Sequence, residues 1–332
     1  MTLTDRISLR PAHSRGCGIA GWLSGFLSTV VLVLLVSCSG KQQTEADLNI
    51  DPALGQAVFA TPDAAAQAFV TAVSTHSAAM LVKLLGDEYR TVLPLDEVAS
   101  EDIDNFLAAW SQSHTLLPDG EQRRLLAVGE HGWTLPVPIA QGDSGWYFDV
   151  PAGEEMMRIR RIGRNELAVL QAVLAYYDAQ TEYAQTDRNG DGALEYAQKF
   201  ISSPGSHDGL YWETPEGQAP SPLGPLFADV TPEGAYHGYF YKMLTAQGPH
   251  ARGGTYDYRI GERMTAGFAL VAWPAVYGDT GVMTFIVSHD GTVYEQDLGE
   301  DSAPAATAMQ AFDPGPGWTP VADAHGALAT AD

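Results

Sequence analysis

The hydrophobic positions of the first part of the chain predict helices followed by strands. Three helices are expected, beginning at Thr61–Pro62 and covering 77–85 and 100–113, because apolar residues recur there every three or four positions. Thr61 followed by Pro62 is a typical helix start. Runs that alternate or are continuously apolar predict strands at 124–128, 132–139 and 145–150, with a hairpin turn at 142–145.

The stretch 164–200 predicts one long amphipathic helix that ends in an acidic, glycine-bearing loop. Its apolar stripe advances in steps of three and four from Leu167 to Tyr177, which is the spacing of a packing face. Four strands are expected after it, at 236–244, 265–273, 281–288 and 292–295, and Asp290–Gly291 is a strong hairpin signal. This order of elements predicts an α+β protein of two domains, at 57–160 and 161–320.

The charge and the cysteine content of the chain argue against several classes of function. The net charge of −23 argues against nucleic acid as a partner, because phosphate binding needs a basic face. The only two cysteines, Cys17 and Cys38, precede the predicted domains. The body of the chain is therefore not a disulfide scaffold, a cysteine-ligated zinc protein or a thiol enzyme.

The first forty residues have the pattern of a bacterial lipoprotein signal. Arginines precede an uncharged apolar run at 19–36, which ends in Leu35-Val36-Ser37-Cys38 and a polar stretch. We expect cleavage after residue 37, lipidation of Cys38, a tether at 38–56 and a disordered tail at 321–332. A membrane-spanning anchor is the alternative, because about 18 apolar residues are just enough to span a bilayer. Position 39, directly after the lipidated cysteine, holds Ser in place of the Asp that favours inner-membrane retention. The predicted location is therefore the outer membrane, facing the periplasm.

The loop after the long helix resembles half of a calcium-binding loop. Asp187, Asn189 and Asp191 stand at the first, third and fifth positions, and Gly192 at the sixth. The twelfth position holds Gln198 in place of a bidentate glutamate, so Glu195 is the substitute ligand. Calcium is therefore a candidate cofactor, and an ordinary Gly/Asn/Asp turn is the alternative.

Several motifs resemble an uncharacterised bacterial family known as domain of unknown function 2950. They are RIGRNEL at 161–167, DRNGDG at 187–192, PGSHDGLYW at 204–212, YHGY at 236–239, GFALVAWP at 267–274 and GVMTF at 281–285. The resemblance covers about residues 57–320 and implies an exported or lipid-anchored protein without assigning an activity. The first domain also resembles the cone-like nuclear-transport-factor-two fold, and the second resembles pilin-like (pseudopilin) globular domains.

These features favour a lipid-anchored, non-catalytic binding or scaffold protein of the cell envelope, with another envelope protein as its expected partner. The alternative is a periplasmic hydrolase or other small-molecule enzyme, with a pocket in the first domain or around His207, Asp208 and His237. These three residues and Tyr211 are the candidate ligand-binding residues. No complete set of nucleophile, base and orienting group follows from their spacing.

Overall fold

The computed structural model describes residues 48–87, 89–93, 100–188, 190–215, 217, 219–224 and 234–322. Contacts place the chain from Gln43 onward in one compact unit, which holds all of these residues. Cys38 and residues 323–332 of the predicted tail lie outside the described residues. No helix within the described ranges is both long and apolar enough to cross a membrane.

The elements before residue 150 surround one hydrophobic core, which we call the first core. Its helical elements are α1 (Pro62–Ser74), α2 (Ala78–Leu85), η2 (Tyr89–Thr91) and α3 (Ser100–Gln112). Its strands are β1 (Ile50–Asp51), β2 (Gln56–Ala57), β3 (His114–Pro118), β4 (Arg123–Val128), β5 (Trp133–Thr134), β6 (Ile139–Gly142) and β7 (Gly145–Phe148). The antiparallel sheet has the order β3-β4-β6-β7, and β5 pairs with β4.

Local sequence signals explain where these elements begin and end. The Thr61 side chain accepts a hydrogen bond from the Ala64 amide and caps α1, and Ser77 caps α2 in the same way. The predicted hairpin turn is confirmed, because Gly142 pairs with Gly145. The expected strand at 132–139 is divided into β5 and β6, because Pro136 and Pro138 supply no backbone N–H for a ladder.

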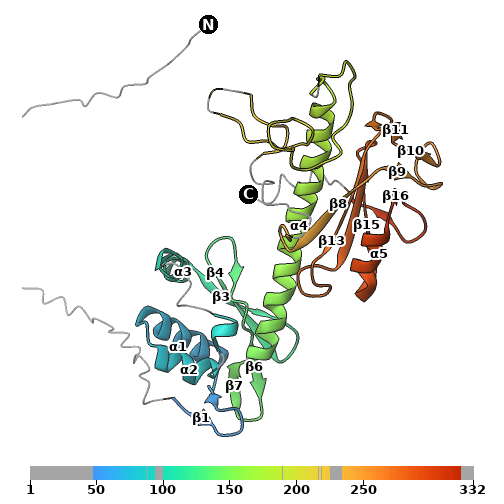
Figure 1. The fold of residues 1–332 in the computed structure, drawn as a ribbon. Coiled ribbons are helices and arrows are strands. Elements are labelled where there is room, and N and C mark those ends of the chain that lie inside the picture. Colours follow the sequence, from blue (N-terminus) through green and yellow to red (C-terminus); the bar gives the residue numbers. More distant parts are fainter. Residues whose placement is uncertain are drawn as a thin grey trace, which may run out of the picture. The chain divides into compact units, whose positions relative to one another are not determined.

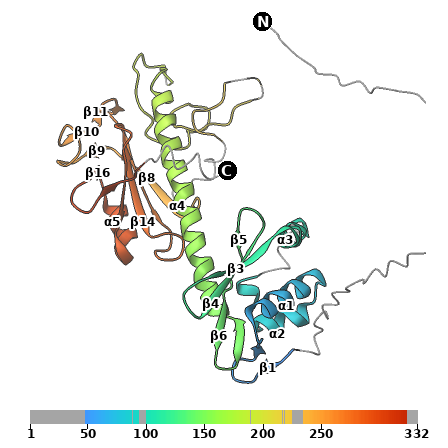
Figure 2. The same cartoon turned by 180° about the vertical axis from the view of Figure 1, so that it is seen from behind.

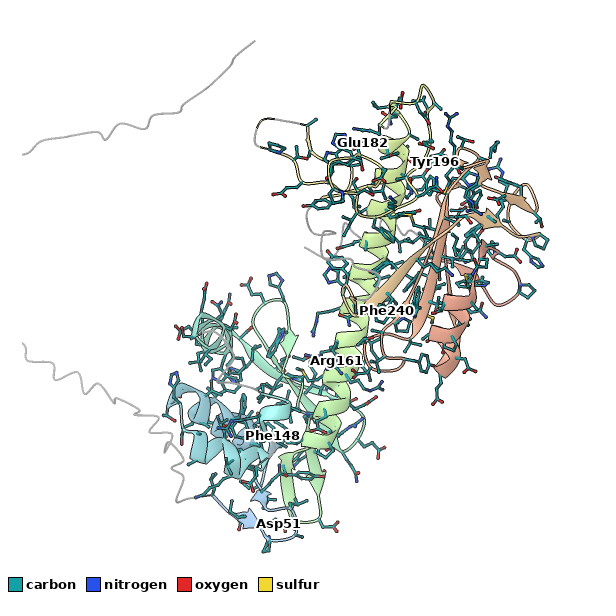
Figure 3. All side chains as sticks on the ribbon, viewed as in Figure 1. Asp51, Phe148, Arg161, Glu182, Tyr196 and Phe240 are labelled. Carbon is teal, nitrogen blue, oxygen red and sulfur yellow. The ribbon has the colours of Figure 1, made fainter. Side chains whose placement is uncertain are left out.

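Helix α4 (Val150–Tyr183) is the long helix, and it contributes to two cores. Its first residue, Val150, belongs to the first core. Seven buried residues between Val169 and Tyr183 belong to a second core, formed with the strands that follow. Arg161 lies in the first half of the helix and Glu182 at its end (Figure 3). The predicted domain boundary at residue 160 falls inside this helix.

The helix starts earlier than the pattern at 164–200 indicates, and it ends before the acidic loop, as that pattern predicts. Asp149 caps it by accepting a hydrogen bond from the Ala152 amide, and Pro151 stands in the first turn. The chain leaves the helix after Tyr183, ahead of the predicted acidic loop. The apolar stripe therefore describes only the half of α4 that packs on the second core.

The second core is built on a five-stranded antiparallel sheet in the order β17-β15-β14-β13-β8. Helix α4 covers one face and the short helix α5 (Ser302–Ala308) the other, as Figures 1 and 2 show from opposite sides. The strands of this sheet are β8 (Tyr239–Leu244), β13 (Ala269–Pro274), β14 (Met283–Ser288), β15 (Val293–Asp297) and β17 (Thr319–Pro320). The smaller elements are β9 (Ala246–Gln247), β10 (Tyr256–Asp257), β11 (Arg259–Ile260), β12 (Arg263–Met264), η4 (Gly299–Asp301) and β16 (Ala311–Phe312).

The predicted fold class is confirmed. Helices and antiparallel sheets are both present, and a long helix packs on the sheet that follows it, so the protein is α+β. The hairpin at Asp290–Gly291 also forms, because β14 and β15 pair across it.

Candidate functional site

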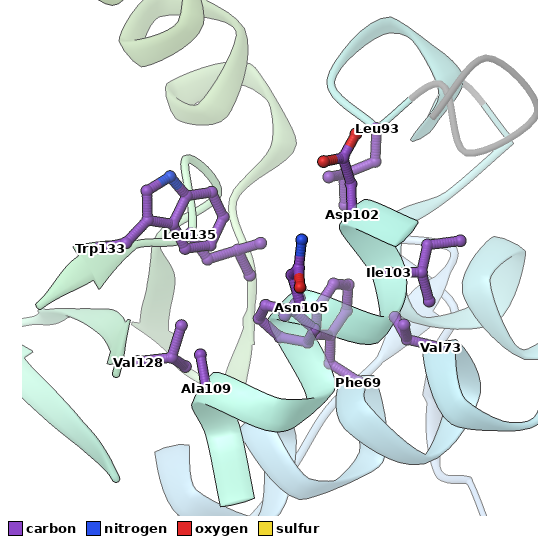
Figure 4. Close-up of a pocket in the computed structure, with 11 residues that line it drawn as sticks. Phe69, Val73, Leu93, Asp102, Ile103, Asn105, Ala109, Val128, Trp133 and Leu135 are labelled. Carbon is purple, nitrogen blue, oxygen red and sulfur yellow. The ribbon is translucent and has the colours of Figure 1, made fainter. Parts of the chain in front are cut away.

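An apolar pocket of about 440 Å³ lies beside α3, and we call it the α3 pocket. Its lining residues come from α1, α3, β4, β5 and the segments next to them (Figure 4). They are Phe69, Val73, Leu93, Asp102, Ile103, Asn105, Phe106, Ala109, Val128, Trp133 and Leu135. A cavity of this size lies in the range of small-molecule sites.

The pocket exists because α3 is incompletely covered by the rest of the first core. The helix carries an apolar face, yet none of its residues is buried. Phe106 extends from this face between two other rings and packs edge-on against both. Its ring centroid lies 6.0 Å from that of Phe69 and 6.1 Å from that of Trp133. Trp133 itself stays 51% exposed, so an aromatic ring stands at the opening of the pocket.

Two polar side chains interrupt the apolar lining. Asp102 and Asn105 occupy successive turns of α3, and Figure 4 shows them across the pocket from Trp133. Neither side chain has a hydrogen-bond or ion-pair partner among the residues that the structure describes. Their polar atoms are therefore free to meet a ligand or water.

Helix α4 fixes the wall of the pocket that carries Trp133. The Arg160 guanidinium donates to the carbonyl of Thr134 at 2.8 Å and to its hydroxyl at 2.5 Å. Thr134 lies between Trp133 and Leu135, two lining residues. Burial lowers the pKa of Arg160 and the neighbouring charge of Arg164 lowers it further, but the side chain remains the donor that holds β5.

The predicted calcium loop follows α4 and is held by its own backbone. Asp187 accepts from the Gly190 and Gly192 amides at 2.7 and 2.8 Å. Asp191 accepts from the Ala193 amide and forms an ion pair with Arg263 at 2.9 Å. Burial, together with the charges of Asp191 and Asp187, raises the pKa of Glu195 against the opposing effect of Arg263.

Calcium binding by this loop stays a prediction. Asn189 lies outside the described residues, and no three His, Cys, Asp or Glu side chains within the described ranges form a group that could hold a metal ion. Calorimetry with millimolar calcium tests the loop directly. Absence of both binding heat and a shift in melting temperature would exclude it.

Asp208 is the centre of a hydrogen-bonded loop at 199–208. Its carboxylate accepts from Lys199 Nζ at 2.5 Å, from the amide of Ser203 at 2.7 Å, and from the hydroxyls of Ser203 and Ser206 at 3.0 Å each. Burial raises the pKa of this carboxyl, but these bonds outweigh burial and hold it well below its ordinary value. A carboxylate with this many donors stabilises a loop and is a poor base.

His207 stacks on Trp212 with 4.4 Å between ring centres, and the Arg188 guanidinium lies 5.5 Å from the same tryptophan ring. Tyr183, at the end of α4, donates to the His207 carbonyl at 2.7 Å. Burial and the nearby carboxylates of Glu195 and Asp208 raise the pKa of Tyr183 to about 12. The loops that carry the predicted metal and ligand residues therefore meet at the C-terminal end of α4.

His237 and Tyr211 do not complete a site there. The His237 ring contacts Tyr236 at 4.1 Å, and the adjacent Gly238 lies against Asn165 of α4. Asn165 and Tyr183 are 18 residues apart on one helix, which separates them by ~27 Å along its axis. Tyr211 forms an isolated bridge with Ile201 and packs against the second core. The structure thus brings His207 and Asp208 together and leaves His237 elsewhere.

Comparison with protein-family models shows which family the chain belongs to. A family model described as protein of unknown function, DUF2950, matches residues 56–321. The chain belongs to this family. The match covers both cores of the DUF2950 protein, including the α3 pocket. No curated protein and no solved structure matches the chain. The likeness to cone-like and pilin-like folds thus remains a sequence resemblance.

The sequence predicts a pocket in the first domain only as part of the enzyme alternative, and it identifies none of the residues that line the α3 pocket. Its lining comes from four elements spread over residues 69–135, and no spacing along the chain places them together. One sequence signal does point there. The predicted helix at 100–113 has an apolar face rich in large rings, and such a face needs either a cover or a ligand.

Proposed function

We propose that this chain is a non-catalytic binding protein of the cell envelope, anchored by a lipid on Cys38, and that the α3 pocket holds its ligand. The observation that supports binding is the chemistry of the pocket. Nine of its eleven lining residues are hydrophobic, and its polar residues are one carboxylate and one amide. An apolar cavity with few polar groups is typical of a ligand site and offers no nucleophile with a base beside it.

The enzyme alternative has weaker support. Asp208 already accepts four hydrogen bonds, and the loops that carry His207 and His237 contact opposite parts of α4, at Tyr183 and Asn165. An acid–base mechanism needs its groups within hydrogen-bond reach of one reacting atom. The described residues around His207 do not provide that arrangement.

The test uses fluorine NMR of the full chain labelled with 5-fluorotryptophan and held in phosphatidylcholine nanodiscs. The probe is 4-phenylbutan-1-ol, a small neutral compound with an apolar body. We expect saturable movement of the Trp133 resonance, because this ring stands at the opening of the pocket. The resonance of Trp273, in the second core, should not move.

A pair of variants on α3 shows whether the pocket is responsible. Ala109→Phe adds a ring inside the cavity and should abolish the response, whereas Ala108→Phe adds the same ring at an exposed position outside the lining. An unchanged Trp133 resonance in the parent protein, at millimolar probe and against empty nanodiscs, would contradict binding in this pocket.

A further inference from the structure

The polar groups of the α3 pocket are placed on one side of its opening. Asp102 and Asn105 lie on consecutive turns of α3, and the half-exposed Trp133 ring stands across from them (Figure 4). Asp102 is the one charged side chain among the described lining residues, and none of these residues is Lys, Arg or His. The lining therefore carries one negative charge and no positive one, and the Arg160 guanidinium next to it is engaged with the carbonyl and hydroxyl of Thr134.

Both walls of the opening favour a positively charged group. A carboxylate forms its strongest hydrogen bonds with cationic donors. An indole ring is the best aromatic partner for a cation at its face. An anionic ligand would instead be repelled by the Asp102 carboxylate, and the Asn105 amide is the one polar lining group that could donate a hydrogen bond to it. Below the opening, the Phe69 and Phe106 rings and the aliphatic residues accept only an apolar body.

We infer that the ligand of the α3 pocket is an organic cation with an apolar body, such as a lipophilic amine. Its hydrocarbon part packs against Phe69, Phe106 and Leu135, and its ammonium group lies between Asp102 and Trp133, with the Asn105 carbonyl as a second acceptor. This inference rests on the proposed function, since it names the class of ligand for the same pocket.

The experiment compares three probes with one carbon skeleton. They are 4-phenylbutylamine, 4-phenylbutan-1-ol and 4-phenylbutanoate, which are cationic, neutral and anionic at pH 7. Each is titrated into the full chain in phosphatidylcholine nanodiscs, with the Trp133 fluorine resonance as the readout and empty nanodiscs as the blank. We expect the amine to bind about fivefold more tightly than the alcohol, and the carboxylate to bind more weakly than either.

The protein is strongly acidic, so general attraction of cations needs a matched control. Asp102→Asn should reduce binding of the amine to the level of the alcohol. Asp104→Asn removes the same charge from the same helix at an exposed position outside the pocket and should leave the preference within twofold. Asn105→Asp adds a carboxylate on the next turn and should strengthen amine binding about twofold. This gain can be measured even if Asp102→Asn folds poorly.

The outcomes separate this inference from the proposed function. Equal binding of the three probes, or a preference lost equally in D102N and D104N, would overturn the cation inference and leave the pocket as a binding site. No response of Trp133 to any probe would overturn both. A preference for the amine that disappears only in D102N, and increases in N105D, supports the assignment.

Discussion

The Asp208 carboxylate stabilises the loop at 199–208, although the sequence predicts Asp208 as a ligand-binding residue. Lys199, Ser203 and Ser206 all donate to it, and together they hold the segment between Phe200 and Tyr211. The hydrogen bonds stabilise the charged form, which is why the pKa of Asp208 lies below 3.8 despite its partial burial. The residue therefore contributes to stability through its charge.

This contribution should depend on pH in a defined direction. A group whose pKa is lowered by folding stabilises the protein above its unfolded pKa, near 3.8, and this stabilisation is lost as the pH falls through the folded value. Asp208→Asn should thus be less stable than the parent by about 1 kcal/mol at pH 7. The difference should shrink below pH 3.8, as measured by urea denaturation from pH 7 to pH 3.

Asp178 provides the control for this pH series. It is exposed on α4, and its carboxylate has no hydrogen-bond or ion-pair partner in the described part of the chain. Asp178→Asn should change the free energy of unfolding by less than about 0.5 kcal/mol. A stability difference for D208N that stays constant from pH 7 to pH 3 would contradict the role assigned to its charge.

At the scale of elements, α4 is joined to the β13–β14 connection by a series of polar contacts. Asn165 donates to the Thr280 carbonyl at 2.8 Å, and Glu166 accepts from the Val282 and Met283 amides at 2.9 and 3.0 Å. Arg161 also pairs with Asp279. These contacts explain the RIGRNEL and GVMTF motifs, since one motif holds the other at the start of β14.

The same junction makes a glycine obligatory. A Cβ at position 281 would lie 2.0 Å from the hydroxyl oxygen of Tyr239 and 2.4 Å from two carbons of its ring, which extends from β8 and is fully buried. Gly281→Ala should therefore destabilise the protein by about 1–3 kcal/mol in a denaturation experiment. The cost should be smaller in a Tyr239→Leu background, which removes the clashing oxygen together with the clashing ring carbons. A double-mutant cycle with no coupling between the two positions would contradict this account.

Local sequence signals predicted most of the longer helices and strands, and the elements that they did not predict have local causes. Thr61–Pro62 marks the start of α1. The same kind of signal at Asp149 and Pro151 does not predict a helix start, because the residues after it are arginine-rich and lack an apolar stripe. Strand β3 alternates weakly, with mostly exposed residues. Helix α5 is short and contains Pro304, so neither period nor propensity identified it. The α3 pocket depends on packing between elements, which spacing does not encode.

At the scale of the whole molecule, Cys38 determines the predicted attachment to the envelope. In the full chain expressed in a bacterial host, Cys38→Ala should abolish incorporation of a labelled fatty acid, because the thiol is the acylated group. The variant should also keep its signal segment, because cleavage before residue 38 should no longer occur. Cys17→Ala should leave lipidation unchanged, since residue 17 precedes the predicted cleavage. Metabolic labelling followed by membrane fractionation measures both. A C38A protein that is still lipidated would contradict the lipoprotein interpretation.

Helix α4 has a consequence for how the protein unfolds. Val150 is buried in the first core and one face of the segment from Val169 to Tyr183 in the second, so one continuous helix belongs to both. Loss of either core would leave half of a 34-residue helix without the packing that maintains it, and isolated helical segments of that length are marginal in water. Heating should therefore produce a single cooperative transition, in which two hydrophobic cores melt together.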